Sequence, residues 1–187
     1  MKIIFVRHGL TKEGKEKKNL IKEGREQARL LAKRLKKEKI DKLYSSDMPR
    51  AKQTAEIISK EINLPIELKP ELREYEEAIF LVEDLSKWPE EEQKKLKKLK
   101  IFLNELIKSK EEDKTILVVA HGITNRLIIS NIMKIPMGRT FYFRQFNTCI
   151  NIIHWTKDSP IKDWKLSLMN DVSHLTHKLG ELSKSND

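Results

Sequence analysis

Ile3-Ile4-Phe5-Val6-Arg7-His8-Gly9 is a short apolar run that ends abruptly in a cation, an imidazole and a glycine. β-Branched and aromatic residues bounded by polar ones are typical of a buried strand, and α/β proteins collect functional groups at the carboxyl ends of such strands. A second run, Thr115-Ile116-Leu117-Val118-Val119-Ala120, ends in the same way in His121-Gly122. The chain therefore predicts two buried strands, each of which delivers a histidine and a glycine to one edge of a sheet.

Helical and strand patterns alternate along the rest of the chain. Apolar spacing predicts helices over about 20–35, 49–62, 89–110 and 124–133, and strands over 40–45, 64–68, 141–155 (one or two strands) and 164–169. Asp47 is the expected N-cap of the helix that begins near Pro49. The pattern predicts a three-layer α/β/α sandwich with a mostly parallel central sheet and a late antiparallel strand. We expect one domain over residues 1–187, in which residues 75–110 select the substrate.

The composition favours an anionic partner. The 187 residues include 38 Lys and Arg against 28 Asp and Glu, a net charge of +10 that attracts phosphate esters, acidic proteins or nucleic acid. Lys and Glu mix over 33–39 and 90–100, which we interpret as solvated helix faces. Cys149 is the only cysteine, so no internal disulfide is possible, as suits a reducing cytoplasm. The first apolar run is too short for a signal-peptide core, and we expect a cytoplasmic protein without a membrane segment.

Four basic side chains are expected to meet beyond the carboxyl ends of the strands, where a parallel sheet carries its ligand crevice: Arg7, His8, Arg50 and His121. Arginine forks reach two oxygens, imidazoles donate one bond, and a helix beginning at Gly122 presents free backbone N–H groups. Gly9 and Gly122 allow close approach of the backbone, because neither has a Cβ. This cationic, donor-rich set predicts a binding site for a tetrahedral oxyanion, for which phosphate is the natural guest.

Two histidines are more than binding requires, and they indicate phosphoryl transfer. An imidazole that holds a backbone carbonyl with one nitrogen keeps the other free, so His8 could attack phosphorus and form a phosphohistidine that water hydrolyses. The arginines and His121 would spread the charge of the transition state. A leaving alkoxide needs a proton, and Glu74 is the candidate acid, with its neighbours Glu76 and Glu77 as alternatives.

Five motifs occur in an order that resembles a known family: Arg7-His8-Gly9, Leu20–Ala28, Ser45–Ala55, Leu72-Arg73-Glu74 and Val119-Ala120-His121-Gly122. Together they resemble the histidine phosphatase superfamily, the phosphoglycerate mutase-like group, with echoes of its tail at Asn147 and 170–175. The resemblance implies a phosphoglycerate mutase-like fold, with His8 as nucleophile and Glu74 as proton donor. It further implies a phosphate pocket of Arg7, Arg50 and His121, and neither a metal nor an organic cofactor.

Two departures from that pattern favour a small phosphatase over a mutase. After Glu74 the chain reads Tyr75-Glu76-Glu77-Ala78-Ile79-Phe80, without the usual Trp-Glu-Gly signature, and the long insertion typical of mutases is lacking. We therefore expect a phosphomonoesterase whose partner is a small phosphorylated substrate or a phosphorylated protein. The alternatives are a phosphoglycerate mutase-type transfer and a non-catalytic module that binds phosphate or nucleic acid.

Three further patterns admit other functions. Gly9–Glu16 matches a Walker A loop except at the last position, where Glu16 replaces the hydroxyl that holds magnesium. His174 and His177 could be half a metal site, although no Cys or carboxylate cluster accompanies them, and we favour capping or surface roles. Aromatics and arginines mix over 139–146, as in single-strand nucleic-acid sites, but aromatics at strand spacing favour a core role.

Overall fold

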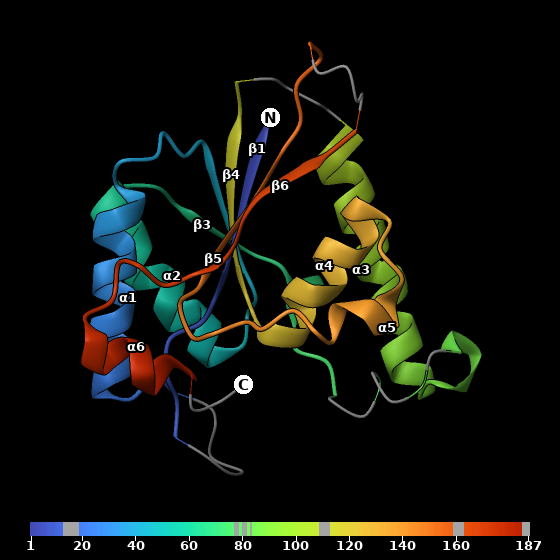
Figure 1. Cartoon of the computed structure of the whole chain (residues 1–187), viewed down its shortest axis with the longest axis horizontal. Helices are drawn as coiled ribbons and strands as arrows, with labels where there is room; N and C mark the ends of the chain where they lie inside the picture. Colours follow the sequence, from blue (N-terminus) through green and yellow to red (C-terminus); the bar gives the residue numbers. More distant parts are fainter. Residues whose placement is uncertain are drawn as a thin grey trace.

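The computed structural model describes residues 1–12, 19–76, 79, 82, 84–108, 113–158 and 163–184. A six-stranded sheet lies between two groups of helices, which confirms the predicted α/β/α sandwich (Figure 1). The strands are β1 (Lys2–Arg7), β2 (Lys42–Ser45), β3 (Ile66–Leu68), β4 (Thr115–Ala120), β5 (Ile150–His154) and β6 (Lys165–Asp171). The α-helices are α1 (Lys22–Leu35), α2 (Pro49–Ile62), α3 (Glu90–Lys108), α4 (Gly122–Met133), α5 (Met137–Thr140) and α6 (His177–Lys184).

The strand order is β3-β2-β4-β1-β5-β6. Strands β1 to β4 pair in parallel, whereas β5 is antiparallel to both of its neighbours, β1 and β6. The predicted late antiparallel strand is therefore β5. The parallel register places Arg7 beside Ala120 and Ser45 beside Val119, so three strands end at one edge of the sheet. That edge carries Arg7-His8 from β1, Ser46 from β2 and His121 from β4.

Alternating side chains of the strands supply both faces of the sheet, as the period of two in a strand requires. Helices α1 and α2 cover one face and α3 and α4 the other (Figure 1). The first face packs Ile4, Val6, Leu31, Leu35, Ala55 and Ile58. The second face packs Ile3, Phe5, Leu99, Leu103, Leu127 and Ile128. Because apolar residues fill both faces of β1 and β4, their short runs are continuous rather than alternating.

The start of α2 differs from the expectation. Pro49 occupies the first turn as predicted, but the N-cap is Met48, which makes no side-chain capping bond. Asp47 instead accepts two hydrogen bonds from the guanidinium of Arg73, one of them 2.7 Å long from Nε. The prediction of Asp47 as a cap was wrong because a bidentate ion pair with Arg73 stabilises this carboxylate more than one hydrogen bond from a backbone N–H would.

The predicted strand over 141–155 is confirmed only for β5. Residues 141–149 form a connection that crosses from α5 beneath the carboxyl ends of the strands (Figure 1). Its backbone pairs with the end of β1, since the N–H of Thr148 lies 3.1 Å from the carbonyl oxygen of Arg7. Phe141 and Tyr142 are 48% and 78% exposed, so the core role expected for them was also wrong.

Helix α3 contradicts the expected solvated face over 90–100 at one point. Glu92 is only 4% exposed, although most of its charged neighbours face solvent. Its carboxylate pairs with Lys95 at 2.6 Å, one turn along the helix. In the part of the chain that the structure describes, neither α3 nor any other helix combines the length and apolarity needed to cross a bilayer.

Candidate active site

The structure brings the four basic residues expected at the sheet edge into one cluster. The ring centroids of His8 and His121 lie 5.2 Å apart with their planes at 63°, and both residues are buried. Arg50, in the first turn of α2, donates a 2.9 Å hydrogen bond from Nε to Nε2 of His8. A Cβ built on Gly122 would stand 3.5 Å from Cζ of Arg7, so this guanidinium lies against the start of α4.

The hydrogen bonds of His8 define its protonation state. Nδ1 lies 2.8 Å from the carbonyl oxygen of Gly9, which can only accept, so Nδ1 carries a proton. Nε2 receives the N–H of Arg50, so Nε2 carries a lone pair. His8 is therefore neutral, and the nitrogen that carries its lone pair, Nε2, faces the guanidinium of Arg50. A phosphoryl group that took over the Arg50 hydrogen bond would leave that lone pair free to attack.

Polar side chains of α2 hold the two motifs around His8 together. The hydroxyl of Thr54 accepts the N–H of Gly9 at 3.1 Å and donates to the carbonyl of Arg50 at 2.8 Å. Thr54 is thus the link between the end of β1 and the first turn of α2. This contact gives a physical reason for a threonine four residues after Arg50.

Gly9 is needed for packing. A Cβ on Gly9 would lie 2.4 Å from the carbonyl oxygen of Gly24, and a Cβ on Gly24 would lie 2.0 Å from that of Leu10. Neither distance is possible for a real side chain, so the loop after β1 and the first turns of α1 touch backbone to backbone. The close approach expected at Gly9 is therefore to α1.

His121 is kept uncharged by its surroundings. Complete burial lowers its pKa well below the usual value, and the positive charges of Arg50 and Arg7 nearby act in the same direction. Nε2 lies 2.9 Å from the hydroxyl of Ser46. Nδ1 is buried and has no hydrogen-bond partner among the residues that the structure describes. A neutral imidazole in this position can offer one N–H or one lone pair to an anion.

The connection 141–149 supports the end of β1 from below. Nη1 of Arg7 donates to the carbonyl oxygen of Gln145, and the side chain of Asn147 donates to the carbonyl of His8 at 3.1 Å. Thr148 has φ of 58°, a left-handed conformation that is rare for a β-branched residue. In that conformation its N–H reaches both the Arg7 and the His8 carbonyls, at 3.1 and 3.3 Å. Backbone strain at Thr148 thus accompanies the placement of Arg7 and His8.

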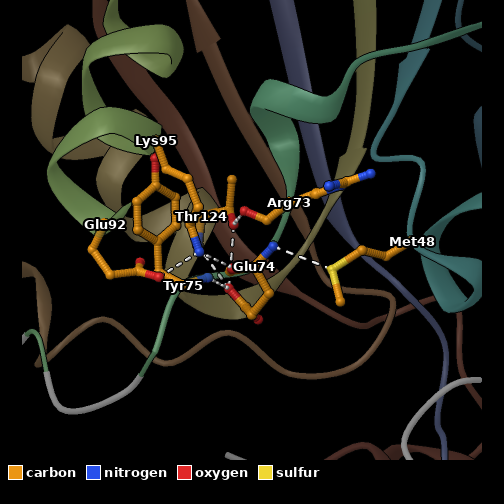
Figure 2. A network of polar contacts seen from close by, with 7 residues as sticks. All are labelled: Met48, Arg73, Glu74, Tyr75, Glu92, Lys95 and Thr124. Atoms are coloured by element: carbon orange, nitrogen blue, oxygen red, sulfur yellow. Dashed lines mark hydrogen bonds and ion pairs between the residues drawn. The ribbon is translucent and has the colours of Figure 1, made fainter. Parts of the chain in front are cut away.

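Glu74 lies close enough to Arg7 and Arg50 to feel their charge, and the start of α4 holds its carboxyl group. Its Oε1 accepts the N–H groups of Tyr75 and Thr124 and lies near the Thr124 hydroxyl, each at 3.2 Å (Figure 2). Burial raises the pKa of Glu74, while Arg7, Arg50 and the two backbone N–H groups oppose the shift. No described residue donates a hydrogen bond to its other oxygen, Oε2. With a raised pKa the carboxyl keeps its proton to a higher pH than an ordinary glutamic acid, and Oε2 is the oxygen left to carry that proton.

The neighbouring carboxylates that could replace Glu74 differ in placement. Glu76 is exposed to solvent, unlike the carboxyl of Glu74. Glu77, like Phe80, lies outside the described residues, as do residues 13–16 of the Walker-like stretch. Glu74 is thus the described carboxylate of this segment that sits with Arg7 and Arg50.

The two histidines of the possible metal site differ in their surroundings. His174 is half-buried, with Nε2 3.3 Å from the hydroxyl of Thr148, while His177 is exposed in the first turn of α6. Within the described ranges, no three His, Cys, Asp or Glu side chains gather closely enough to hold a metal ion.

Comparison with known proteins agrees with the geometry. The sequence profile of the histidine phosphatase superfamily (branch 1) matches residues 3–171. The chain belongs to the histidine phosphatase superfamily. The resemblance drawn from the five motifs is thereby confirmed.

Members of the histidine phosphatase superfamily with both mutase and phosphatase names are similar to this chain. Probable phosphoglycerate mutase GpmB of Photorhabdus laumondii is 26% identical over 215 residues, covering 98% of this chain and 100% of that protein. Phosphoserine phosphatase 1 of Hydrogenobacter thermophilus is 26% identical over 183 residues, covering 82% and 86%. A phosphoserine phosphatase mutant from Entamoeba histolytica, solved with phosphoserine, has a TM-score of 0.74 at 23% identity over 94% of this chain and 99% of that one. The last similarity confirms the fold.

Three residues at the site of this superfamily member were missed by the sequence reasoning. Thr124 carries a weak signal, because a threonine in the first turn of a helix often bonds a neighbouring loop. Lys95 carries none, since it stands among similar lysines on a charged helix. The sequence around Thr148 also gives no signal, because no neighbouring residue indicates a positive φ at this position.

Proposed function

We propose that this chain is a metal-independent phosphomonoesterase that hydrolyses a phosphate ester, or a phosphorylated side chain, through a covalent phosphohistidine on His8. The observation that carries the proposal is the pair of hydrogen bonds to the ring of His8, which together select its neutral tautomer. Its proton is held on Nδ1 by the Gly9 carbonyl, 2.8 Å away, and its lone pair lies on Nε2 among the basic residues. A site that only bound phosphate would gain more from a protonated imidazole, whereas a nucleophile needs the free lone pair.

The first chemical step transfers the phosphoryl group to the enzyme. The Nε2 lone pair of His8 attacks phosphorus, and the bond from phosphorus to the ester oxygen breaks in line with it. The departing oxygen takes the proton of Glu74, which becomes a carboxylate. The product of this step is the free alcohol, and phosphohistidine remains on the enzyme.

The second step releases the phosphate. The Glu74 carboxylate takes a proton from water as the water oxygen attacks phosphorus, and the bond between phosphorus and Nε2 breaks. Glu74 is then protonated again and His8 has recovered its lone pair, so the cycle closes without an external acid or base.

Charge stabilisation falls to the residues around His8. Arg7 and Arg50 supply guanidinium forks for the equatorial oxygens, which carry the negative charge of the transition state. The lowered pKa keeps His121 neutral. Its Nδ1–H can donate a hydrogen bond to one of these oxygens while Nε2 accepts a hydrogen bond from the Ser46 hydroxyl. A preorganised set of this kind costs no reorganisation when charge develops.

The substrate class follows from the relatives and from segment 75–110. The relatives named as phosphatases act on small phosphorylated molecules such as phosphoserine, which supports a small phosphate ester here. We assign segment 75–110 to substrate selection because it follows Glu74 directly and returns to the site through Lys95. A mutase remains the second candidate, since a relative covering the whole chain carries that name.

The first test is hydrolysis of p-nitrophenyl phosphate in excess EDTA. Activity should persist in EDTA and fall by at least about 10³-fold in His8→Ala, because no other residue supplies the nucleophile. His177→Ala, which removes an exposed histidine, is the matched control and should behave as wild type. A requirement for metal, or full activity in His8→Ala, would refute the phosphohistidine route.

Incubation of the wild-type protein with 3-phosphoglycerate distinguishes the phosphatase reaction from the mutase reaction. Incubated with 3-phosphoglycerate, a phosphatase releases inorganic phosphate in step with substrate loss, whereas a mutase returns the phosphoryl group and yields the 2-isomer. We expect phosphate release. Isomer formation with little free phosphate would select the mutase instead.

A further inference from the structure

Lys95, on α3, makes contacts that the proposed chemistry has not used. We infer that Lys95 is a positioning residue that holds the proton donor, Glu74, in place for transfer to the leaving group. The inference rests on the proposed function of Glu74. It assigns a role to a helix that carries none of the five motifs.

The ammonium of Lys95 joins α3 to the segment that bears Glu74. Nζ donates to the backbone carbonyl of Glu74 at 2.8 Å and to Oε1 of Glu92 at 2.6 Å (Figure 2). It also lies 4.7 Å from the centre of the Tyr75 ring, within the range of a cation–π contact. Two acceptors and a ring face therefore surround the ammonium on the side of Glu74.

Glu74 needs such a support because residues 73–76 form no helix or strand. The N–H of Glu74 points at the sulfur of Met48, 3.4 Å away, and sulfur is a weak acceptor. The preceding carbonyl, of Arg73, accepts the Thr124 hydroxyl at 3.1 Å. The bond from Lys95 is the charge-assisted one among these anchors and is therefore the strongest.

Lys95 is itself held in one position. Glu92 is 4% exposed, and a carboxylate so deeply buried requires a cation beside it. Burial and the nearby Glu92 and Glu74 raise the pKa of Tyr75, so its ring stays neutral beneath the ammonium. Lys94, one residue earlier, differs in every respect: it is exposed and pairs only with Glu90 and Glu91 on the surface.

A purely structural lysine and a positioning lysine differ in their dependence on the leaving group. A p-nitrophenolate leaves without a proton, whereas an alkoxide needs one from Glu74. Loss of a residue that positions Glu74 should therefore harm alkyl phosphate esters and spare aryl ones. Loss of a residue that only stabilises the fold should harm both equally.

The experiment measures kcat/KM for p-nitrophenyl phosphate and for phosphoserine in three variants. In Lys95→Met combined with Glu92→Leu, which leaves no buried unpaired charge, we expect a loss of at least about tenfold on phosphoserine and less than about threefold on the aryl ester. Lys94→Met should change neither value. If the double variant does not fold, Lys95→Gln, which keeps the length and removes the charge, applies the same comparison.

The possible outcomes separate the two proposals. Equal losses on both esters, or no loss on either, would overturn the assignment of Lys95 while leaving the phosphatase proposal intact. Wild-type protein that hydrolyses neither ester would overturn the phosphatase proposal, and the role of Lys95 with it. A loss confined to phosphoserine supports both.

Discussion

The two sides of the candidate active site are built differently. On the side of the proposed nucleophile, Arg7 ends β1, and His8 and His121 follow directly on β1 and β4, whose parallel register fixes where these side chains emerge. On the donor side, Glu74 lies in an irregular segment and is held by Thr124 and Lys95, which are 50 and 21 residues away in sequence. A sheet edge positions residues through local sequence, while a loop does so only through distant contacts.

The two sides also shift the pKa of their key groups in opposite directions. Burial and the neighbouring arginines lower the pKa of His121, and burial raises that of Glu74. Both shifts favour the neutral form, the imidazole on one side and the protonated carboxyl on the other. Such a separation is what acid catalysis beside a nucleophile requires.

The largest expected effect concerns the donor side and is seen in the pH dependence of kcat/KM. Because the pKa of Glu74 is raised, the protonated acid persists to higher pH, and kcat/KM for phosphoserine should fall as pH rises through that pKa. Glu74→Gln should reduce the plateau by about 10²–10⁴-fold and abolish this fall. A pH–rate profile of both proteins checks it. A fall at high pH that survives in Glu74→Gln would assign the acid to another residue.

A smaller effect concerns the nucleophile side and the backbone contact beneath it. Gly24→Ala would place a Cβ 2.0 Å from the Leu10 carbonyl, so α1 must move away from the loop after β1. We expect a loss of about 2–4 kcal/mol in the free energy of unfolding, measured in urea. Gly180→Ala, in α6 with no heavy atom within 4 Å of the new Cβ, is the control and should gain up to about 1 kcal/mol. Equal stability of Gly24→Ala and wild type would show that the two backbones do not touch.

The smallest effect at neutral pH concerns His174, which contacts Thr148 behind the proposed nucleophile. Burial lowers the pKa of His174 to about 4 from the usual 6.5, so the unfolded chain binds this proton first as pH falls. Stability present above pH 6.5 is then lost toward pH 4, at about 1.4 kcal/mol per pH unit from this group. His174→Gln should flatten the pH dependence of unfolding by that slope, while His177→Gln should not. An unchanged slope in His174→Gln would contradict the burial of a neutral imidazole.

Much of the sheet and the nucleophile side could be predicted from sequence. The strands before Arg7 and His121 are buried on both faces, and strands of this kind are recognisable in a sequence as continuous apolar segments. His8 and His121 meet because both strands end at the same edge, a consequence of parallel pairing alone. Their roles in catalysis remain predictions.

The donor side and the connection 141–149 could be predicted less well. The local sequence pattern predicted Asp47 as an N-cap, but the ion pair that Asp47 forms is with Arg73, 26 residues away in sequence. Phe141 and Tyr142 suited a strand core, but the chain there bonds the end of β1 and leaves them exposed. Lys95 suited a solvated helix face, and only the tertiary fold brings it to the Glu74 carbonyl. Local periodicity does not carry this information.

The central claim is that Nε2 of His8 becomes phosphorylated, and rapid-quench mass spectrometry of the intact protein during turnover of phosphoserine tests it most directly. Quenched at alkaline pH, which preserves phosphohistidine, wild-type protein should carry one phosphoryl group that maps to His8 and is lost on acidification. His8→Ala should carry none. Turnover of the substrate by wild-type protein with no phosphoryl group on His8 at any time point would contradict the account.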